Sequence, residues 1–155
     1  MAVAKDLSLA ERIDRLESIE AIKRLKARYC THCDDDYAPD AIASLFAEDA
    51  VWQASEGFGE HRGREAIRSF FAGVSGRITF AAHLVLNPVV EVDGDRGTGA
   101  WRLIMPCTVV EDGAPEARWM VGEYDDRFVR QDGVWLFQSL NVTINIFAPH
   151  RTGWA

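Results

Sequence analysis

Three Asp-Gly dipeptides in the second half of the chain constrain its fold more than any other feature. They are Asp93-Gly94, Asp112-Gly113 and Asp132-Gly133, and each separates two runs in which apolar residues alternate with polar ones. Asp-Gly between such runs is a strong hairpin signal, because glycine adopts the positive φ that a tight turn needs. The pattern therefore predicts an antiparallel meander of four strands. These strands cover residues 79–92, 97–110, 116–130 and 134–147.

Two prolines interrupt the predicted meander. Pro88 lies in its first strand and Pro106 in its second. Because proline cannot donate a ladder hydrogen bond, it occurs at strand edges and at bulges, and bulges bend a sheet. We therefore expect a strongly curved sheet whose concave side is closed by helices.

The first half of the chain is predicted to be helical. Residues 9–33 carry apolar side chains at three- and four-residue steps, which form one stripe along a helix. Two further helices are expected over residues 40–47 and 64–74, with a short strand at 50–54 between them. Helices followed by strands are typical of an α+β domain. The stripe consists of Ile13, Leu16, Ile19, Ile22, Leu25 and Tyr29.

The size and charge of the chain limit what it can bind. Its 155 residues, 48% of them hydrophobic, fit one domain over 1–155, with an ordered core over roughly 9–149. The net charge of −7 argues against nucleic acid and against an anionic membrane surface, since both need a basic face. No apolar run approaches the roughly 20 residues of a spanning helix, and the first six residues contain no apolar signal core. We therefore expect a cytoplasmic protein that binds neither nucleic acid nor membrane.

The three cysteines, Cys30, Cys33 and Cys107, do not predict a metal site. A zinc ion would need a second pair of ligands at suitable spacing, and Cys107 is the only further cysteine. The pair Cys30 and Cys33 also lies late in a predicted helix, whereas a redox motif of this spacing lies at a helix start. We therefore expect these thiols to pack as small apolar groups, with no metal and no organic cofactor.

A histidine and a run of aspartates are the candidate chemical groups. His83 interrupts the apolar segment 80–86, where a buried imidazole needs a hydrogen-bond partner. Three aspartates, residues 34–36, end the first helix, where the partial negative charge of the helix terminus disfavours carboxylates unless a partner compensates. Helical spacing places Asp36 nearest the apolar stripe, but only if the helix continues that far. From spacing alone, both Asp34 and Asp36 remain candidates to pair with His83.

Six segments spread over the chain form a pattern shared with a known family. They are 19–29 (Ile-Glu-Ala-Ile-Lys-Arg-Leu-Lys-Ala-Arg-Tyr), Asp34, 45–50 (Leu-Phe-Ala-Glu-Asp-Ala), His83, Asn87-Pro88 and 132–135 (Asp-Gly-Val-Trp). This pattern resembles the SnoaL-like domains of the nuclear-transport-factor-2-like superfamily, over nearly the whole chain. The resemblance implies a cone-shaped α+β barrel of cystatin-like fold, in which N-terminal helices pack on a strongly curved, mainly antiparallel sheet.

Within this family, the chain is most similar to the branch that contains scytalone dehydratase, bile acid 7α-dehydratase and hexachlorocyclohexane dehydrochlorinase. That branch uses an Asp–His pair inside the cone. The resemblance implies that the family aspartate falls on Asp34, the family histidine on His83, and a catalytic tyrosine of the bile acid dehydratase on Tyr29. It thus prefers Asp34 over Asp36.

Charged groups of these relatives are missing from this chain. The dehydrochlorinase has a lysine where this chain has Tyr29 and an arginine where it has Leu140. The bile acid dehydratase has an aspartate and an arginine at positions that fall on Met105 and Ile144. What remains is Tyr29 with the Asp–His pair, in a cavity more apolar than those of the relatives.

The resemblance and these residues together predict a cofactor-independent lyase of dehydratase type, or an isomerase, that acts on a hydrophobic cyclic small molecule. His83 is expected to remove a proton from carbon, Asp34 to fix the imidazole tautomer, and Tyr29 to hydrogen-bond with a substrate oxygen. The resemblance also implies a homodimer or homotrimer. The alternative is a non-catalytic ligand-binding or assembly module, like the β subunits of ring-hydroxylating dioxygenases. Residues expected to form the pocket are Trp52, Phe58, Trp101, Met105, Met120, Leu140 and Ile144.

Overall fold

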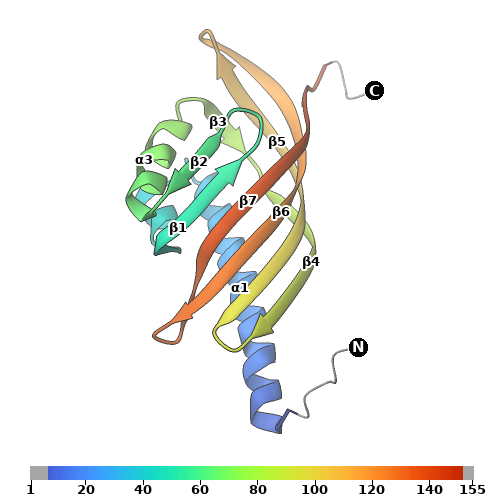
Figure 1. Ribbon diagram of the computed structural model, residues 1–155. Helices are drawn as coiled ribbons and strands as arrows, with labels where there is room; N and C mark the ends of the chain where they lie inside the picture. The colour runs from blue at the N-terminus through green and yellow to red at the C-terminus, as the bar shows by residue number, and fades with distance from the viewer. Residues whose placement is uncertain (1–6, 152–155) are drawn as a thin grey trace.

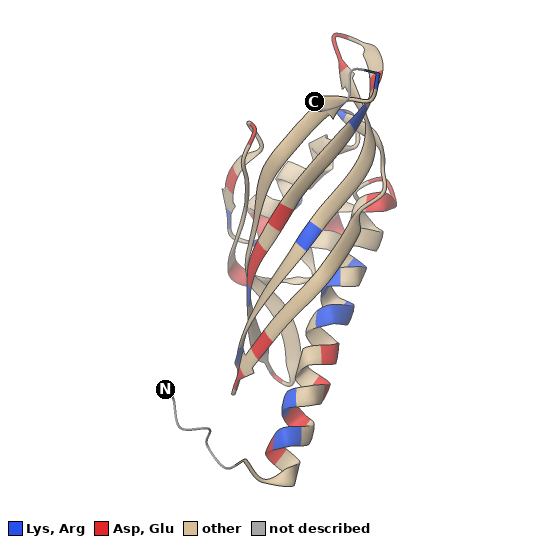
Figure 2. Ribbon diagram, turned by 90° about the vertical axis from the view of Figure 1, so that its right-hand side faces the viewer, with Lys and Arg blue, Asp and Glu red and all other residues tan. Residues whose placement is uncertain are grey.

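Three helices cover one face of a single curled sheet (Figure 1). The computed structural model describes residues 7–151. The helices are α1 (Leu9–Asp34), α2 (Pro39–Ala43) and α3 (Arg64–Val74). The strands are β1 (Phe46–Ala54), β2 (Gly59–Arg62), β3 (Ile78–Ala81), β4 (Leu84–Asp93), β5 (Arg96–Glu111), β6 (Ala114–Gln131) and β7 (Val134–Pro149). Figure 2 shows α1, rich in charged residues, packed along the sheet.

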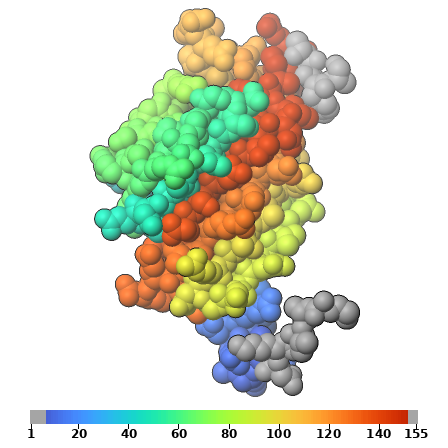
Figure 3. Space-filling model, viewed as in Figure 1, coloured from blue at the N-terminus to red at the C-terminus, as the bar shows by residue number. Residues whose placement is uncertain are grey.

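The helix α1 begins with a capping box. The Ser8 hydroxyl accepts a hydrogen bond from the Glu11 backbone N–H, and the Glu11 carboxylate accepts one from the Ser8 N–H. Its first turns extend beyond the end of the sheet (Figure 3), which leaves Ile13 47% and Leu16 64% exposed. The predicted stripe is therefore buried only in the later part of the helix. None of the helices within residues 7–151 is both long and apolar enough to cross a membrane.

The strands follow the order β2-β1-β7-β6-β5-β3, with β4 also paired to β5. All pairs are antiparallel except β1–β7, which is parallel. The hairpins that join β4 to β7 turn at the predicted Asp-Gly sites, where Gly94, Gly113 and Gly133 have positive φ. The predicted α+β class and the curved antiparallel sheet are thus confirmed. Within the described chain, β2 and β3 end the order unpaired with each other, so the sheet is curled and is not a closed barrel.

The segment predicted as one strand over 79–92 is two strands. Both strands pair with β5 but at different places: Ala81, the last residue of β3, pairs with Cys107, and Leu84, the first residue of β4, pairs with Ile104. Ala82 and His83 lie between the two strands, and the Ala82 N–H donates to the Pro106 carbonyl over 3.1 Å. His83 therefore leaves the ladder, which allows both its backbone and its ring to meet α1.

Two predicted boundaries near residue 45 were wrong, and one strand was missed. The helix α2 ends at Ala43, and β1 already begins at Phe46. The missed strand β2 is short and polar, so it has no apolar alternation that could predict it. It pairs with the end of β1 and lies beside α3, at one side of the core.

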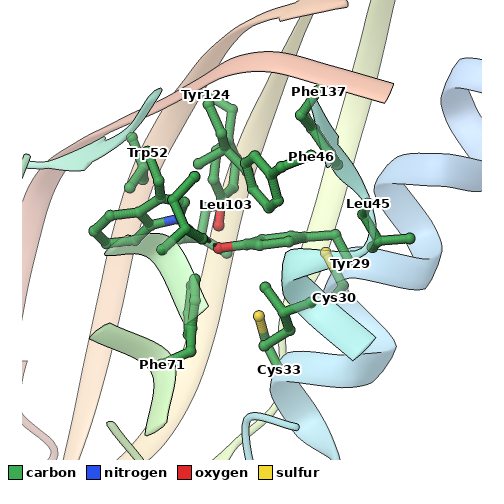
Figure 4. Packing of buried hydrophobic residues seen from close by; sticks show 14 of the residues in the cluster. Tyr29, Cys30, Cys33, Leu45, Phe46, Trp52, Phe71, Leu103, Tyr124 and Phe137 are labelled. Carbon is green, nitrogen blue, oxygen red and sulfur yellow. Dashed lines mark hydrogen bonds between the residues drawn. The ribbon is translucent and has the colours of Figure 1, made fainter. Parts of the chain in front are cut away.

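The hydrophobic core fills the space between the helices and the concave face of the sheet (Figure 4). Phe46 of β1 and Phe137 of β7 stack with ring centroids 5.0 Å apart, and Tyr29 of α1 packs edge-on against both. These contacts fix the later part of α1 against the sheet. The end of this helix carries the candidate aspartates, so the core packing positions them.

Candidate active site

Asp34 and His83 form a hydrogen-bonded pair. The His83 Nδ1 lies 2.6 Å from the Asp34 Oδ1, and the His83 backbone N–H donates to both carboxylate oxygens, at 3.0 and 3.1 Å. The His83 side chain is 7% exposed and that of Asp34 is 34% exposed. Because the carboxylate accepts the Nδ1–H, the neutral ring has its lone pair on Nε2. This geometry suits a general base whose orientation is fixed by a carboxylate.

The chain reversal after α1 decides which aspartate meets His83. Asp34 is the last residue of the helix, and the turn that follows places Asp36 and Tyr37 at positive φ, 54° and 52°. The Tyr37 N–H donates to the Cys33 carbonyl over 3.2 Å and closes the helix end. Asp36 is therefore exposed on the turn, and the helical-spacing argument for it fails because α1 stops before it.

A small apolar cavity lies beside the pair. Its volume is about 40 Å³, which is about three times the roughly 10–15 Å³ that one water needs. His83 lines it, and so do Tyr29 and five of the seven residues expected to form the pocket, Trp52, Phe58, Met105, Met120 and Ile144. Sequence reasoning missed nine further lining residues, which are Tyr37, Ala54, Phe70, Phe71, Val74, Ile78, Leu103, Tyr124 and Val142.

The other two expected pocket residues, Trp101 and Leu140, do not line the cavity. Both point inward as their strand alternation predicts, at 4% and 0% exposure, but they lie in the solid part of the core. Trp101 packs against Phe128, and Leu140 is the strand partner of Trp52. Alternation identifies the inward face of a strand, but it does not show where along the strand the core opens.

Tyr29 is held in place by the indole of Trp52. The Trp52 Nε1–H donates to the Tyr29 hydroxyl over 2.9 Å (Figure 4). Burial raises the pKa of Tyr29 well above its usual value, so the phenol keeps its proton. Because the hydroxyl accepts the bond from Trp52, its own proton can be donated to a group in the cavity.

His61 is a further aromatic group near the cavity. Its ring stacks on Phe70 with centroids 4.0 Å apart, and its Nε2 lies 2.9 Å from the Phe58 carbonyl oxygen. Both contact residues line the cavity. The sequence carries no signal for the position of His61 beside the cavity, because the strand β2 that carries it was itself not predicted.

The most unexpected feature is a buried ion pair behind the cavity wall. Lys26 of α1 and Asp126 of β6 are both 0% exposed, and the Lys26 Nζ donates to Asp126 Oδ2 over 2.8 Å. The Asn141 N–H donates to the other carboxylate oxygen, and burial raises the pKa of Asp126 to about 6 although Lys26 opposes the shift. The sequence does hold a signal, since Lys26 stands four residues after Ile22, on the apolar stripe.

The three cysteines pack as the sequence predicts. Cys30, Cys33 and Cys107 are all buried free thiols. Burial raises the pKa of the Cys30 thiol to about 11 and shifts the pKa of Cys33 in the same direction. Within residues 7–151, no three side chains of the types that bind metals lie close enough together to hold an ion.

The comparisons with known proteins agree with this fold. The hexachlorocyclohexane dehydrochlorinase LinA Type2 is 28% identical, with a TM-score of 0.81 over 89% of this chain and 92% of that one. A candidate scytalone dehydratase from Novosphingobium aromaticivorans, 22% identical, has a TM-score of 0.76 over 87% of this chain and 89% of that one. A protein of the same organism described as NTF2-like with a cystatin-like fold, 24% identical, has a TM-score of 0.68 over 93% and 92%. The last two show the fold alone. No curated protein sequence matches.

The family itself follows from the sequence match. The SnoaL-like domain family matches residues 14–141, which include Asp34, His83 and most of the core. The fold of this family carries lyase activity in the dehydrochlorinase. The chain therefore belongs to the family of SnoaL-like domains.

Proposed function

We propose that this protein is a cofactor-independent lyase that eliminates water from a hydrophobic cyclic ketone, or an isomerase that uses the same proton abstraction. The single observation that carries the proposal is the 2.6 Å contact between Asp34 and His83 at the wall of an apolar cavity. A carboxylate that holds an imidazole in one tautomer is an arrangement that suits general base catalysis. The similarity to a dehydrochlorinase, which is a lyase, supports it.

The proposed reaction starts at the carbon next to a carbonyl. His83 Nε2 takes the proton, the electron pair of the C–H bond forms a C=C bond, and the carbonyl electrons move to the oxygen to give an enolate. Tyr29 donates a hydrogen bond to an oxygen of the substrate. The enolate then expels a β-hydroxyl group, which takes the proton from the His83 imidazolium and leaves as water. His83 is neutral again, and the product is a conjugated enone.

The size of the cavity sets a condition for this reaction. A volume of about 40 Å³ is well below the roughly 300–1,000 Å³ of typical ligand pockets. A cyclic substrate must therefore displace lining side chains. Phe58 is the best candidate to move, because it lies in the turn between β1 and β2 and is only half-buried.

The proposal is tested with a panel of cyclic β-hydroxy ketones, with enone formation followed by its ultraviolet absorbance. We expect turnover by the wild-type protein, and loss of about 10²–10⁴-fold in His83→Ala. The matched control is His150→Ala, which removes an exposed imidazole whose one side-chain hydrogen bond within residues 7–151 is to Trp119. A His83→Ala variant with full turnover would contradict the mechanism and favour a binding or assembly module.

We also propose that the protein forms a homodimer or homotrimer, as the family resemblance implies. Apolar side chains on β3 and β4 support self-association, because Phe80, Leu84 and Val89 are 55%, 48% and 63% exposed. Sedimentation analysis tests this, and a monomer at all concentrations would contradict it.

A further inference from the structure

The buried pair of Lys26 and Asp126 has no evident purpose in stabilising the fold. Both side chains are 0% exposed, so both charges have lost their hydration. Replacing a buried ion pair by apolar residues of similar volume is often neutral or stabilising. We therefore considered the electrostatic effect of the two charges on the groups around them.

The ammonium group of the pair packs against two tyrosines of the cavity wall. The Lys26 Nζ lies 3.1 Å from the centroid of the Tyr124 ring and 5.3 Å from that of Tyr29. Both tyrosines line the cavity, whereas neither Lys26 nor Asp126 does. The ammonium group therefore lies against the rings of two residues of the cavity wall.

The Tyr124 hydroxyl lacks a protein partner. Tyr124 is 3% exposed, and no group among residues 7–151 hydrogen-bonds with its hydroxyl. The Tyr29 hydroxyl, in contrast, already accepts a hydrogen bond from the Trp52 Nε1–H. In Figure 4 the hydroxyl ends of Tyr29 and Tyr124 point toward one another, and both residues line the cavity. A largely buried phenol needs a hydrogen-bond partner, and a ligand oxygen would supply one.

We propose that Tyr124 is the donor that binds the carbonyl oxygen of the substrate, which leaves Tyr29 for the oxygen of the β-hydroxyl group, and that Lys26 is a positioning residue that strengthens Tyr124 as a donor. The inference deepens the proposed function and rests on it, because the same carbonyl acidifies the carbon that faces His83. The substrate class is therefore a ring compound with its carbonyl directed at β6 and its apolar body against Phe58, Phe70 and Phe71, which line the rest of the cavity.

The electrostatic effect follows from the positions of the substrate carbonyl, the Tyr124 phenol and the Lys26 ammonium. When His83 removes the proton, negative charge develops on the carbonyl oxygen at the Tyr124 hydroxyl. The Lys26 ammonium lies behind that phenol, in an interior where charges interact far more strongly than in water. It transfers no proton; its field favours the enolate over the ketone and polarises the O–H bond of Tyr124.

The test uses two probes of nearly equal shape, 1-indanone and indane, which differ by the carbonyl oxygen. Their binding is measured by NMR titration of the wild-type protein, Tyr124→Phe and the double variant Lys26→Met/Asp126→Leu. We expect the wild type to bind 1-indanone about 2- to 10-fold more tightly than indane. Tyr124→Phe should lose this preference, and the double variant should lose part of it. A merely structural role would weaken the binding of both probes alike.

Matched variants separate the possible failures. The double variant is used because Lys26→Met alone would leave Asp126 buried without its partner. Arg102→Met/Glu123→Leu removes an exposed ion pair from β5 and β6, and it should keep the wild-type preference. His83→Ala should keep the preference for 1-indanone even if it abolishes catalysis. A failure of the proposed function can thus be distinguished from a failure of the inference about Tyr124 and Lys26.

Four outcomes would overturn the inference. They are a wild-type protein with no preference for 1-indanone, an unchanged preference in Tyr124→Phe, and a loss in Arg102→Met/Glu123→Leu as large as in the double variant. The fourth is a preference lost in Tyr37→Phe but not in Tyr124→Phe, since Tyr37 also lines the cavity.

Discussion

The Asp34 carboxylate holds both the ring and the backbone of His83. It accepts the ring Nδ1–H and also the backbone N–H, so both the direction of the chain and the tautomer of the ring depend on one side chain. A carboxylate can accept both bonds at once, because each oxygen has two lone pairs. No other side chain of similar size would satisfy both groups equally well.

Asp34→Asn should therefore damage catalysis more than folding. The amide can still accept the backbone N–H through its oxygen, but its NH₂ group favours the imidazole tautomer with the lone pair on Nδ1. We expect turnover to fall by about 10²–10⁴-fold with little change in the melting temperature. Steady-state kinetics and thermal unfolding measure the two effects, and equal activity in the Asp34→Asn variant and the wild-type protein would argue against tautomer control.

The thiols make a second prediction at this scale. Because Cys30, Cys33 and Cys107 are buried and burial raises the pKa of each, at pH 8 they are neutral and shielded. A thiol-specific disulfide reagent should modify them slowly in the folded protein and rapidly after unfolding in guanidinium chloride. Rapid modification of Cys30 or Cys33 in the native protein would show that the end of α1 opens readily.

At the scale of the elements, the close approach of β6 and β7 depends on a glycine. At the bulge between Val121 and Gly122, a Cβ on Gly122 would lie 2.4 Å from the Thr143 carbonyl oxygen, which is a backbone atom. The backbone cannot move away without breaking the pairing of two long strands. This glycine therefore permits the bend that curls the sheet around the cavity.

Gly122→Ala should lower the free energy of unfolding by about 1–3 kcal/mol. Gly73→Ala is the matched control, because it adds the same methyl group in α3 where no atom lies within 4 Å. The control should raise stability by about 0.5–1 kcal/mol through helix propensity. Urea unfolding compares the two variants, and equal stabilities would refute the steric account of the bulge.

The elements themselves were largely predictable, because each has a local signal. The Asp-Gly turns located the hairpins among β4, β5, β6 and β7, and the helix α3 has the predicted bounds, Arg64–Val74. The break between β3 and β4 was not predictable, since both sides of His83 are equally apolar. The pairing of Asp34 came from the family resemblance and not from helical spacing, which fails where the helix ends.

At the scale of the whole molecule, the inner face of the sheet combines an open half and a solid half. The cavity lies toward His83, and the solid half holds the ion pair of Lys26 and Asp126 with Trp101 and Leu140. The ion pair joins residues 100 positions apart, so no local pattern could reveal Asp126 as the partner of Lys26. Tyr124 is also far from Lys26 in the sequence, which explains why the two residues were not predicted to lie together.

The ion pair predicts a non-additive pattern of stability. Lys26→Met alone should destabilise the protein by about 3–5 kcal/mol, because it leaves a buried carboxylate without its partner. Lys26→Met/Asp126→Leu should be close to the wild type or more stable, since no buried charge remains. Chemical denaturation of both variants and of Asp126→Leu completes the cycle. Additive losses would mean that the two residues act independently.

The most direct test of the central claim, proton abstraction by His83, is the exchange of the α-protons of 1-indanone with D₂O. NMR follows the loss of these proton signals with the wild-type protein, His83→Ala and Asp34→Asn. We predict that the wild type accelerates the exchange and that His83→Ala reduces the acceleration by about 10²–10⁴-fold, with Asp34→Asn also impaired. Equal exchange rates with the wild type and His83→Ala, at concentrations where both bind 1-indanone, would contradict the account.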